Sequence, residues 1–376
     1  MRVLIVPSWY PSAENPTAGV FIQQQAKALA DAGIDVAVLH VDPGATTFAP
    51  VMSTENGISV VRAGIAATGL RARYFGYRSA GQAAFDTLRE TWGSPDIVHV
   101  QALWPAGLIA RDIKRRTGIP FVVTEHSEEY LAHSRRRLVR TPGMLSLVLR
   151  PLAREASAYI AVSRYLADRL VELGLTHEPF VIPNVVPECA PAPMVVSPPH
   201  TIAHVSVMSP AKNLATLLDA TAALRSQRQD FILCLAGEGE CREELMRRAN
   251  ELGLSEFVEF PGRLPGRDVQ NLLARSVFAV VSSTHETFSV WAAEALMCGR
   301  PVLSTRCGGP EEFVTPEVGR LVSADDVDAM AEGLAWMLDH FSEFEAELLS
   351  IYATERFAPE VVARRIIDAY SAAVPT

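Results

Sequence analysis

The chain has 376 residues, 49% of them hydrophobic and 20% charged, values that fit a soluble protein of two ordinary globular domains and exclude a disordered chain. Its net charge of −9 is unevenly distributed, because residues 1–185 carry 19 basic and 16 acidic side chains, whereas the rest carries 15 and 27. The acidic second half argues against nucleic acid as the main partner.

Apolar patterning predicts alternating strands and helices from the first residues onward. The opening MRVLIVPSWYP has one arginine and a short apolar run that Pro7 interrupts, so it predicts a first strand at 2–6 and not a signal peptide. No apolar run is long enough to span a membrane. Further strands are predicted at 35–39, 58–62, 97–100, 121–124, 158–162 and 180–182, and helices at 20–32, 77–92, 106–117 and 164–173.

A proline-rich segment, 187–199, lacks periodicity and predicts a linker between domains. The pattern then restarts, with strands at 202–207, 231–236, 258–260, 277–281 and 301–304, and helices at 213–226, 242–252, 268–274, 289–298, 324–340, 343–352 and 359–373. Such alternation is typical of parallel sheets with helical crossovers. We predict Rossmann-like domains over 1–186 and 200–355, and a C-terminal helix over 356–376 that crosses back onto the first domain.

Two further patterns bear on location. The five cysteines show neither paired metal spacing nor an even disulfide framework, so they predict reduced thiols in a cytoplasmic protein. The basic run from Arg135 to Arg140 precedes an apolar stretch that ends at Leu149. A solvated face is the favoured interpretation; the alternative is an amphipathic helix that makes peripheral contact with the inner, anionic face of a membrane.

The stretch from Ser282 to Val314 is the most informative part of the chain. Glu286 lies just before the predicted helix 289–298, Glu294 lies within that helix, and a turn containing Gly308 and Gly309 follows the next strand. A strand, a polar turn and a helix start form an anion-binding corner, because free backbone N–H groups and the helix dipole point at one spot. Carboxylates beside it suit hydroxyl donors, so we expect a ligand that carries phosphate and hydroxyl groups, such as a nucleotide sugar.

Seven segments together resemble one enzyme family. They are SWYPSAENPTAGVFIQQQAKAL, VVTEHS, VIPNVV, VSVMSPAKN, LAGEGE, FPGRLP and HETFSVWAAEALMCGRPVLSTRCGGPEEFV. In this order they resemble the retaining glycosyltransferases of family four, the group 1 enzymes similar to glycogen synthase and mannosyltransferases. The resemblance implies a GT-B fold, which is α/β with two Rossmann-like domains, parallel sheets and an interdomain cleft.

The resemblance also implies an activity. The enzyme would move a sugar from a nucleoside diphosphate sugar, UDP- more readily than GDP-linked, to the hydroxyl of a carbohydrate, lipid-linked or small-molecule acceptor. Because no paired carboxylate nucleophile is implied, a same-face substitution is expected, in which the leaving phosphate helps to deprotonate the acceptor. No metal or other cofactor is expected, and Asp326 and Asp328 are interpreted as first-turn carboxylates of a helix.

Three charged residues receive roles from the resemblance. Glu294 would accept hydrogen bonds from the ribose, Glu286 would position the donor sugar and support positive charge at the anomeric carbon, and Lys212 would neutralise the leaving diphosphate. The alternatives are a solvent-facing Glu294, a helix-dipole Glu286 and a surface Lys212. The last is less attractive in a chain with only three lysines. The arginine that the family has five residues before this lysine is Val207 here.

Other residues would complete the site. Backbone N–H groups of Thr287, Phe288 and Ser289 would bind the diphosphate, and Ser289 is also predicted to cap the helix. His126 would hydrogen-bond the donor sugar, whereas His99 is predicted to be a core residue. The remaining candidates are Gly19 for close backbone approach, Gly237 and Glu238 in a turn, Gly262 and Arg263 beside the base, and Arg263 or Arg306 as the cation that replaces the missing arginine.

Two other functions remain open at this level. One is a nucleotide-sugar epimerase of the same two-domain architecture, which the two glutamates disfavour. The other is a nucleotide-sugar-binding partner that has lost catalysis, for which Val207 is the support.

Overall fold

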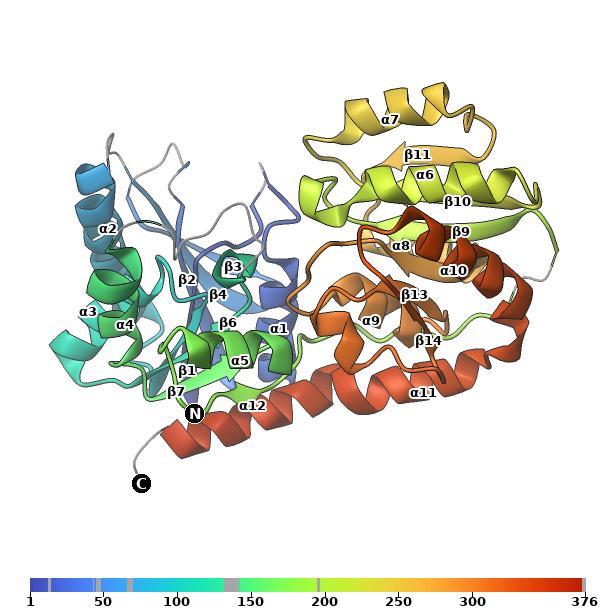
Figure 1. Cartoon of the computed structure of the whole chain (residues 1–376). Helices are drawn as coiled ribbons and strands as arrows, with labels where there is room; N and C mark the ends of the chain where they lie inside the picture. Colours follow the sequence, from blue (N-terminus) through green and yellow to red (C-terminus); the bar gives the residue numbers. More distant parts are fainter. Residues whose placement is uncertain are drawn as a thin grey trace. The chain divides into compact units, whose positions relative to one another are not determined.

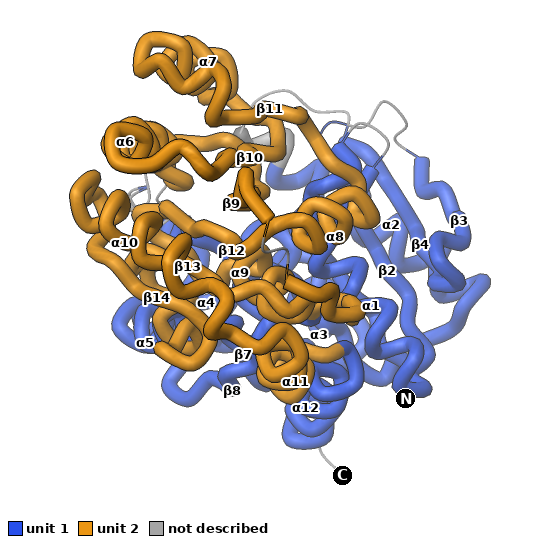
Figure 2. Tube along the Cα trace, turned by 90° about the vertical axis from the view of Figure 1, so that its right-hand side faces the viewer, with its two compact units in different colours: residues 1–185, 359–376 blue, residues 186–358 orange. Residues whose placement is uncertain are grey.

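Two units make up the computed structural model of the chain (Figure 1). All residues are described except 13–14, 43, 45–48, 66–69, 132–140, 142, 195–196 and 374–376, and for 70–73 only the backbone is described. The basic run from Arg135 to Arg140 therefore lies outside the described residues. Unit 1 comprises Met1–Val185 and Pro359–Thr376, and unit 2 comprises Val186–Ala358 (Figure 2). Among the described helices, none has the length and apolar character that crossing a bilayer requires.

A mostly parallel sheet forms the centre of unit 1. Its strands are β1 (Arg2–Pro7), β2 (Asp35–Asp42), β3 (Val51–Glu55), β4 (Ile58–Gly64), β5 (Ile97–Gln101), β6 (Phe121–Glu125), β7 (Ala158–Ala161) and β8 (Phe180–Val181). They lie in the order β3-β4-β2-β1-β5-β6-β7-β8, and only β3 runs antiparallel to its neighbour. Strand β3 was not predicted, because this exposed edge strand lacks the apolar run that marks a strand buried on both faces.

The helices of unit 1 come from both ends of the chain. They are α1 (Val20–Asp31), α2 (Leu70–Thr91), α3 (Gly107–Thr117), α4 (Arg150–Ala153), α5 (Arg164–Glu172) and α12 (Pro359–Ala373). A single 3-10 turn lies at Glu128–Tyr130, and a short π-helix lies at Met144–Leu149. Helix α12 packs against α1 and buries Val362, Ile366 and Tyr370 in a core shared with Val3 and Ile5 of β1. The last helix of the chain thus completes the core of the first unit, and Figure 2 shows it in the colour of that unit.

Unit 2 is built on a fully parallel sheet. Its strands are β9 (His200–Val205), β10 (Phe231–Ala236), β11 (Val258–Gly262), β12 (Ser276–Val281), β13 (Val302–Thr305) and β14 (Gly319–Val322), in the order β11-β10-β9-β12-β13-β14. Strand β14 was not predicted, because four residues that include a glycine and an arginine show no strand periodicity. The strand order reverses at β9, whose neighbours are β10 and β12, and ligands of open α/β sheets bind at such a point.

Helices flank this sheet in the pattern of a doubly wound fold. They are α6 (Leu214–Arg225), α7 (Arg242–Glu251), α8 (Gly266–Arg275), α9 (Val290–Met297), α10 (Val327–His340) and α11 (Ala346–Phe357). Helix α10 packs against α6, and α11 packs against α9. Short 3-10 turns occupy Pro210–Lys212, Gly309–Glu312 and Phe341–Glu343.

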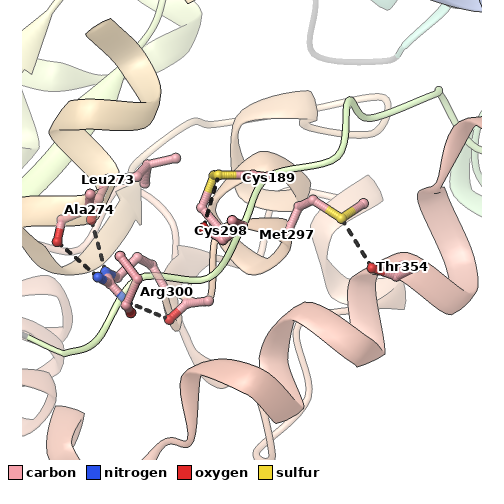
Figure 3. The surroundings of a disulfide bond; sticks show 10 residues. Cys189, Leu273, Ala274, Met297, Cys298, Arg300 and Thr354 are labelled. Atoms are coloured by element: carbon pink, nitrogen blue, oxygen red, sulfur yellow. Dashed lines mark hydrogen bonds between the residues drawn. A yellow bond between two sulfur atoms is a disulfide. The ribbon is translucent and has the colours of Figure 1, made fainter. Parts of the chain in front are cut away.

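A disulfide bond connects the first residues of unit 2 to the end of α9. A disulfide joins Cys189 to Cys298, the residue after the last turn of α9 (Figure 3). The prediction of reduced thiols was therefore wrong for this pair, whose sequence separation of 109 residues gives no local signal. Beside it, the fully buried Arg300 donates to the carbonyl oxygens of Ala192, Pro193, Leu273, Ala274 and Gly299. The segment 187–193 is thereby held against the rest of unit 2.

Breaking the disulfide is expected to destabilise unit 2. Closing so long a loop restricts the unfolded chain, and such bonds typically contribute about 2–4 kcal/mol to the free energy of unfolding. We expect Cys189→Ser, or reduction with dithiothreitol, to lower the urea midpoint of unit 2 accordingly. Dithiothreitol should have no further effect on the variant. Identical unfolding curves for oxidised and reduced wild-type protein would show that the bond contributes nothing.

Candidate functional site

An ion pair stands at the carboxyl ends of β9 and β12. Lys212 ends the 3-10 turn after β9, Glu286 follows β12, and Nζ of Lys212 lies 2.7 Å from Oε1 of Glu286. The two loops are joined by further bonds: Oγ of Ser282 donates to the Lys212 carbonyl (2.8 Å), and the Thr284 N–H donates to the Ala211 carbonyl (2.9 Å). Both charged side chains are largely shielded, at 25% and 13% exposed, so their interaction is stronger than that of a surface pair.

Glu286 is held in place from three sides. Its backbone N–H donates to the Cys307 carbonyl (2.7 Å), and its own carbonyl accepts from the Gly309 N–H (3.0 Å). The Ser283 hydroxyl donates to Oε1 at 2.7 Å. Burial opposes ionisation, but Lys212 and Ser283 together hold the pKa of Glu286 below its usual value. Ser283 was not predicted as a site residue, because its position three residues upstream of Glu286 carries no periodic signal.

The start of α9 presents backbone donors beside this pair. Within the described part of the chain, the N–H groups of Phe288 and Ser289 have no hydrogen-bond acceptor. Ser289 occupies the N-cap position with φ 74°, but its side chain makes no capping bond, so the predicted side-chain cap was wrong. The Phe288 ring packs against Phe313 and Phe357, with centroids 5.3 and 5.4 Å away, which anchors the loop. Free N–H groups at the positive end of a helix suit an anion.

Glu294 lies one turn further along α9 and is unlike Glu286. Among the residues that the structure describes, its carboxylate has no hydrogen-bond or ion-pair partner, and burial alone raises its pKa from 4.5 to about 7. A shielded carboxylate without partners is unfavourable in the ionised state. Its oxygens can therefore gain from hydroxyl groups that a ligand brings.

Two glycine turns extend the site along the sheet edge. A Cβ at Gly237 would overlap the Ser206 carbonyl oxygen, so only glycine allows this close approach. The Gly237 N–H donates to the Gly262 carbonyl, and the Met208 N–H donates to the Glu238 carbonyl, both at 2.8 Å. The loops that follow β9, β10 and β11 are thus hydrogen-bonded to one another along the carboxyl end of the sheet.

Arg263 and Arg306 are the two candidates to replace the arginine that the family has at the position of Val207. Val207 itself is 61% exposed. Arg263 is exposed directly after β11, whereas Arg306 forms an ion pair with Glu311 at 3.5 Å. Arg263 therefore remains a candidate to replace the family's arginine, because its guanidinium does not take part in that ion pair.

The two predicted site residues of unit 1 follow β1 and β6. Gly19 is the N-cap of α1 with φ 69°, and a Cβ there would lie 2.6 Å from the Trp9 carbonyl oxygen, which requires glycine. His126 follows β6, where its N–H donates to Oε1 of Glu125 at 3.0 Å and its ring lies 4.7 Å from that of Phe21. Burial lowers the pKa of His126 to about 3, so the ring is neutral at physiological pH.

Buried polar side chains surround His126, and most of them were not predicted. Nε2 of His126 lies 2.7 Å from Oε1 of Gln101, and Asn184 also hydrogen-bonds the ring. His99 is fully buried and contacts the Tyr370 hydroxyl at 2.6 Å, which confirms its predicted core position. The signal that could have pointed to Gln101 was its position at a strand end.

Comparisons with known proteins cover almost the whole chain. Residues 18–188 match the family model described as Glycosyltransferase Family 4, and residues 195–348 match that described as Glycosyl transferases group 1. The glycogen synthase of Mycobacterium tuberculosis is 27% identical over 361 residues, which span 90% of this chain and 86% of that protein.

Solved structures share the fold. The sucrose-phosphate synthase of Thermosynechococcus elongatus has a TM-score of 0.77 at 19% identity and covers 98% of both chains. HepE of Anabaena, solved in complex with UDP and glucose, has a TM-score of 0.76 at 19% identity, over 98% of this chain and 99% of its own. These likenesses identify the architecture as GT-B, as predicted.

Proposed function

This chain belongs to the family 4, group 1 glycosyltransferases that use nucleotide sugars, and we propose that it transfers the sugar of a UDP-sugar to an acceptor hydroxyl with retention of configuration and without a metal. The observation that carries the proposal is the contact of Lys212 with Glu286 beside the free N–H groups of α9. A cation, helix-end donors and a carboxylate in one corner supply partners for a diphosphate and for a sugar hydroxyl.

Each group would have a distinct task. Lys212 and the N–H groups of Phe288 and Ser289 would stabilise the charge that develops on the leaving diphosphate. Glu286, held by Lys212 and Ser283, would accept a hydrogen bond from the donor sugar, and Glu294 would accept from the ribose hydroxyls. Since Lys212 and Ser283 both donate to Oε1, Oε2 is the oxygen of Glu286 that would accept the hydrogen bond from the donor sugar. A same-face substitution fits this arrangement, with a phosphate oxygen taking the acceptor proton.

The donor base and the absence of a metal are supported indirectly. HepE of Anabaena, which has the same fold, is solved with UDP and glucose. Gly262 and Arg263, at the end of β11, would flank the base. Asp326 accepts from the Ala329 N–H at 2.9 Å as the N-cap of α10, so its carboxylate serves as a helix cap and is not proposed as a metal ligand.

We propose a carbohydrate, lipid-linked or small-molecule acceptor.

The test is a nucleotide-sugar screen followed by turnover. We expect UDP-sugars to raise the Tm most, and UDP to be released only when an acceptor is added. Excess EDTA should leave the rate unchanged, and NMR of the product should show the anomeric configuration of the donor. Binding without UDP release, across an acceptor pool, would instead identify a catalytically impaired binding protein. Interconversion of the sugar nucleotide without acceptor would identify an epimerase, and an inverted product would refute retention.

A further inference from the structure

A surface pocket of unit 2 lies beside β14 and α10. Its lining residues are distinct from those of the donor corner, which Lys212, Glu286 and the start of α9 form. The pocket has a volume of about 630 Å³, within the range of small-molecule sites. Two arginines line it, Arg306 directly after β13 and Arg320 on β14. The proposed sugar transfer gives this pocket no role.

Arg320 is already oriented by an aromatic ring. Its guanidinium carbon lies 4.7 Å from the centre of the Trp336 ring, on which His340 also stacks at 4.3 Å. Among the residues that the structure describes, no carboxylate pairs with Arg320. A stacked guanidinium keeps its N–H donors at its edge, and their planar arrangement matches the oxygens of a phosphate. Arg320 can therefore bind an anion with little further ordering.

Arg306 supplies a second guanidinium, and its present partner is easily replaced. It forms an ion pair with Glu311 at 3.5 Å, in which the two side chains are 59% and 35% exposed. Exposed ion pairs of this length contribute little to stability, because water competes for both charges. A phosphate carries more charge than one carboxylate and can accept two parallel N–H bonds from a guanidinium. A phosphate in the pocket can therefore take Arg306 from Glu311.

Acidic and aromatic side chains define the rest of the ligand. Glu317 and Glu343 line the pocket together with Trp336 and Phe344. Carboxylates repel a ligand with several negative charges, such as a nucleoside diphosphate, but accept hydrogen bonds from hydroxyl groups. The Trp336 ring is already stacked on two side chains, so it offers little surface to a nucleobase. A single phosphate with hydroxyl groups and a compact apolar face, as in a sugar phosphate, meets all of these conditions.

A short path of contacts connects the pocket to the donor corner. Glu311 is held at both oxygens, because Oε1 accepts from the Gly308 N–H at 2.9 Å and Oε2 pairs with the arginine just described. The next residue of the turn, Gly309, donates to the Glu286 carbonyl at 3.0 Å, and a Cβ on it would lie 2.5 Å from the Cα of Phe288. A ligand that takes the arginine leaves Glu311 held at one oxygen only. The turn that supports the start of α9 then gains freedom.

We propose that this pocket binds a sugar phosphate and that its occupation weakens nucleotide binding at the donor corner. Arg306 and Arg320 bind the phosphate, and Glu317 and Glu343 accept hydrogen bonds from the sugar hydroxyls. Binding in the pocket is independent of the proposed transfer reaction, whereas the coupling rests on the role proposed for the N–H groups at the start of α9. Because coupling is reciprocal, a nucleotide must weaken the binding of the sugar phosphate by the same factor.

Calorimetric titration of the full chain with glucose 6-phosphate tests the pocket. We expect Arg320→Gln to bind it at least about tenfold more weakly than wild type, the loss expected from one charged hydrogen bond. Arg247→Gln, which changes an exposed arginine of α7 that pairs with Glu251, is the matched control and should bind as wild type does. Glucose and inorganic phosphate, titrated separately, should each bind at least about tenfold more weakly than glucose 6-phosphate.

A second set of titrations tests the coupling. Saturating glucose 6-phosphate should weaken the binding of UDP to wild type by at least about fivefold, and saturating UDP should weaken that of glucose 6-phosphate by the same factor. Arg320→Gln should bind UDP as wild type does, and the concentration of glucose 6-phosphate that saturates wild type should not change this. Lys212→Ala, which lacks the cation of the donor corner, should retain wild-type affinity for glucose 6-phosphate.

The outcomes separate the pocket from the proposed function. Equal affinity of wild type and Arg320→Gln for glucose 6-phosphate, or loss of that affinity in Lys212→Ala instead, would overturn the pocket. Glucose 6-phosphate that binds in the pocket but leaves the affinity for UDP unchanged would refute the coupling. Failure of UDP to bind at all, with glucose 6-phosphate still bound, would refute the proposed function alone. If Arg320→Gln does not fold, as judged by circular dichroism, the same titrations of Arg306→Gln decide.

Discussion

Replacing Lys212 by alanine is expected to lower kcat about 10²–10³-fold, the usual loss when one preorganised donor to a developing anion is removed. Lys212 Nζ lies 2.7 Å from Glu286 at the switch between β9 and β12. Without it, the diphosphate charge would be stabilised chiefly by the N–H groups at the start of α9. Because Val207 occupies the position where the family has an arginine, no second cation from that position can compensate.

Steady-state kinetics with matched variants would check this result. Lys27→Ala removes an exposed lysine that pairs with Asp31 on α1, and it should leave kcat unchanged. Glu286→Gln should also lower kcat, and its effect should not add to that of Lys212→Ala, since the two side chains are in contact. A Lys212→Ala enzyme within threefold of wild type would contradict the assigned role.

Glu294→Gln is expected to stabilise the protein while weakening nucleotide binding. Burial raises the folded-state pKa of Glu294 from 4.5 to about 7, so the native state binds this proton more tightly than the unfolded state. Stability is therefore lost as the pH rises from 4.5 through 7, by roughly 2–3 kcal/mol after allowance for partial exposure. Glutamine cannot ionise, so the variant should unfold at higher urea than wild type above pH 7 and at the same urea near pH 4.5.

Nucleotide binding should follow the opposite trend. Ribose hydroxyls donate best to the ionised carboxylate, so UDP should bind wild type more tightly as the pH rises through 7. The variant should bind about 10–100-fold more weakly above pH 7, the value of a charged hydrogen bond, and without this pH dependence. Calorimetric titration at several pH values measures both. Glu332→Gln changes an exposed glutamate of α10 and serves as the control; equal behaviour of the two variants would remove Glu294 from the site.

The fold could be predicted where burial leaves a clear pattern. Central strands such as β1, β5 and β12 are buried along nearly their whole length, and their apolar runs were recognised. Edge strands β3 and β14 were not predicted. Strand β3 is largely exposed, and the apolar run of β14 is too short, with only four residues. The register of edge strands is set by their neighbours, which local sequence does not describe.

The site was predicted only as far as its motif extends. Lys212 and Glu286 belong to segments with a recognisable order, and the structure places them in contact. Ser283 acts through a side-chain bond to Glu286 in its own loop, and Gln101 through one to His126 after a neighbouring strand; a single sequence carries no record of such bonds. Ser289 shows the converse: its residue type is a good helix cap, but its positive φ turns the side chain away from that role.

The course of translation gives α12 a further significance. Ribosomes release the chain from its N-terminus, and domains generally fold as they emerge. Unit 2 ends at Ala358, so all of its residues are made before α12 begins. Unit 1 must wait for Val362, Ile366 and Tyr370, which follow all of unit 2 along the chain. The nascent protein therefore completes its second unit first, and the apolar face of α1 stays uncovered until α12 has been made.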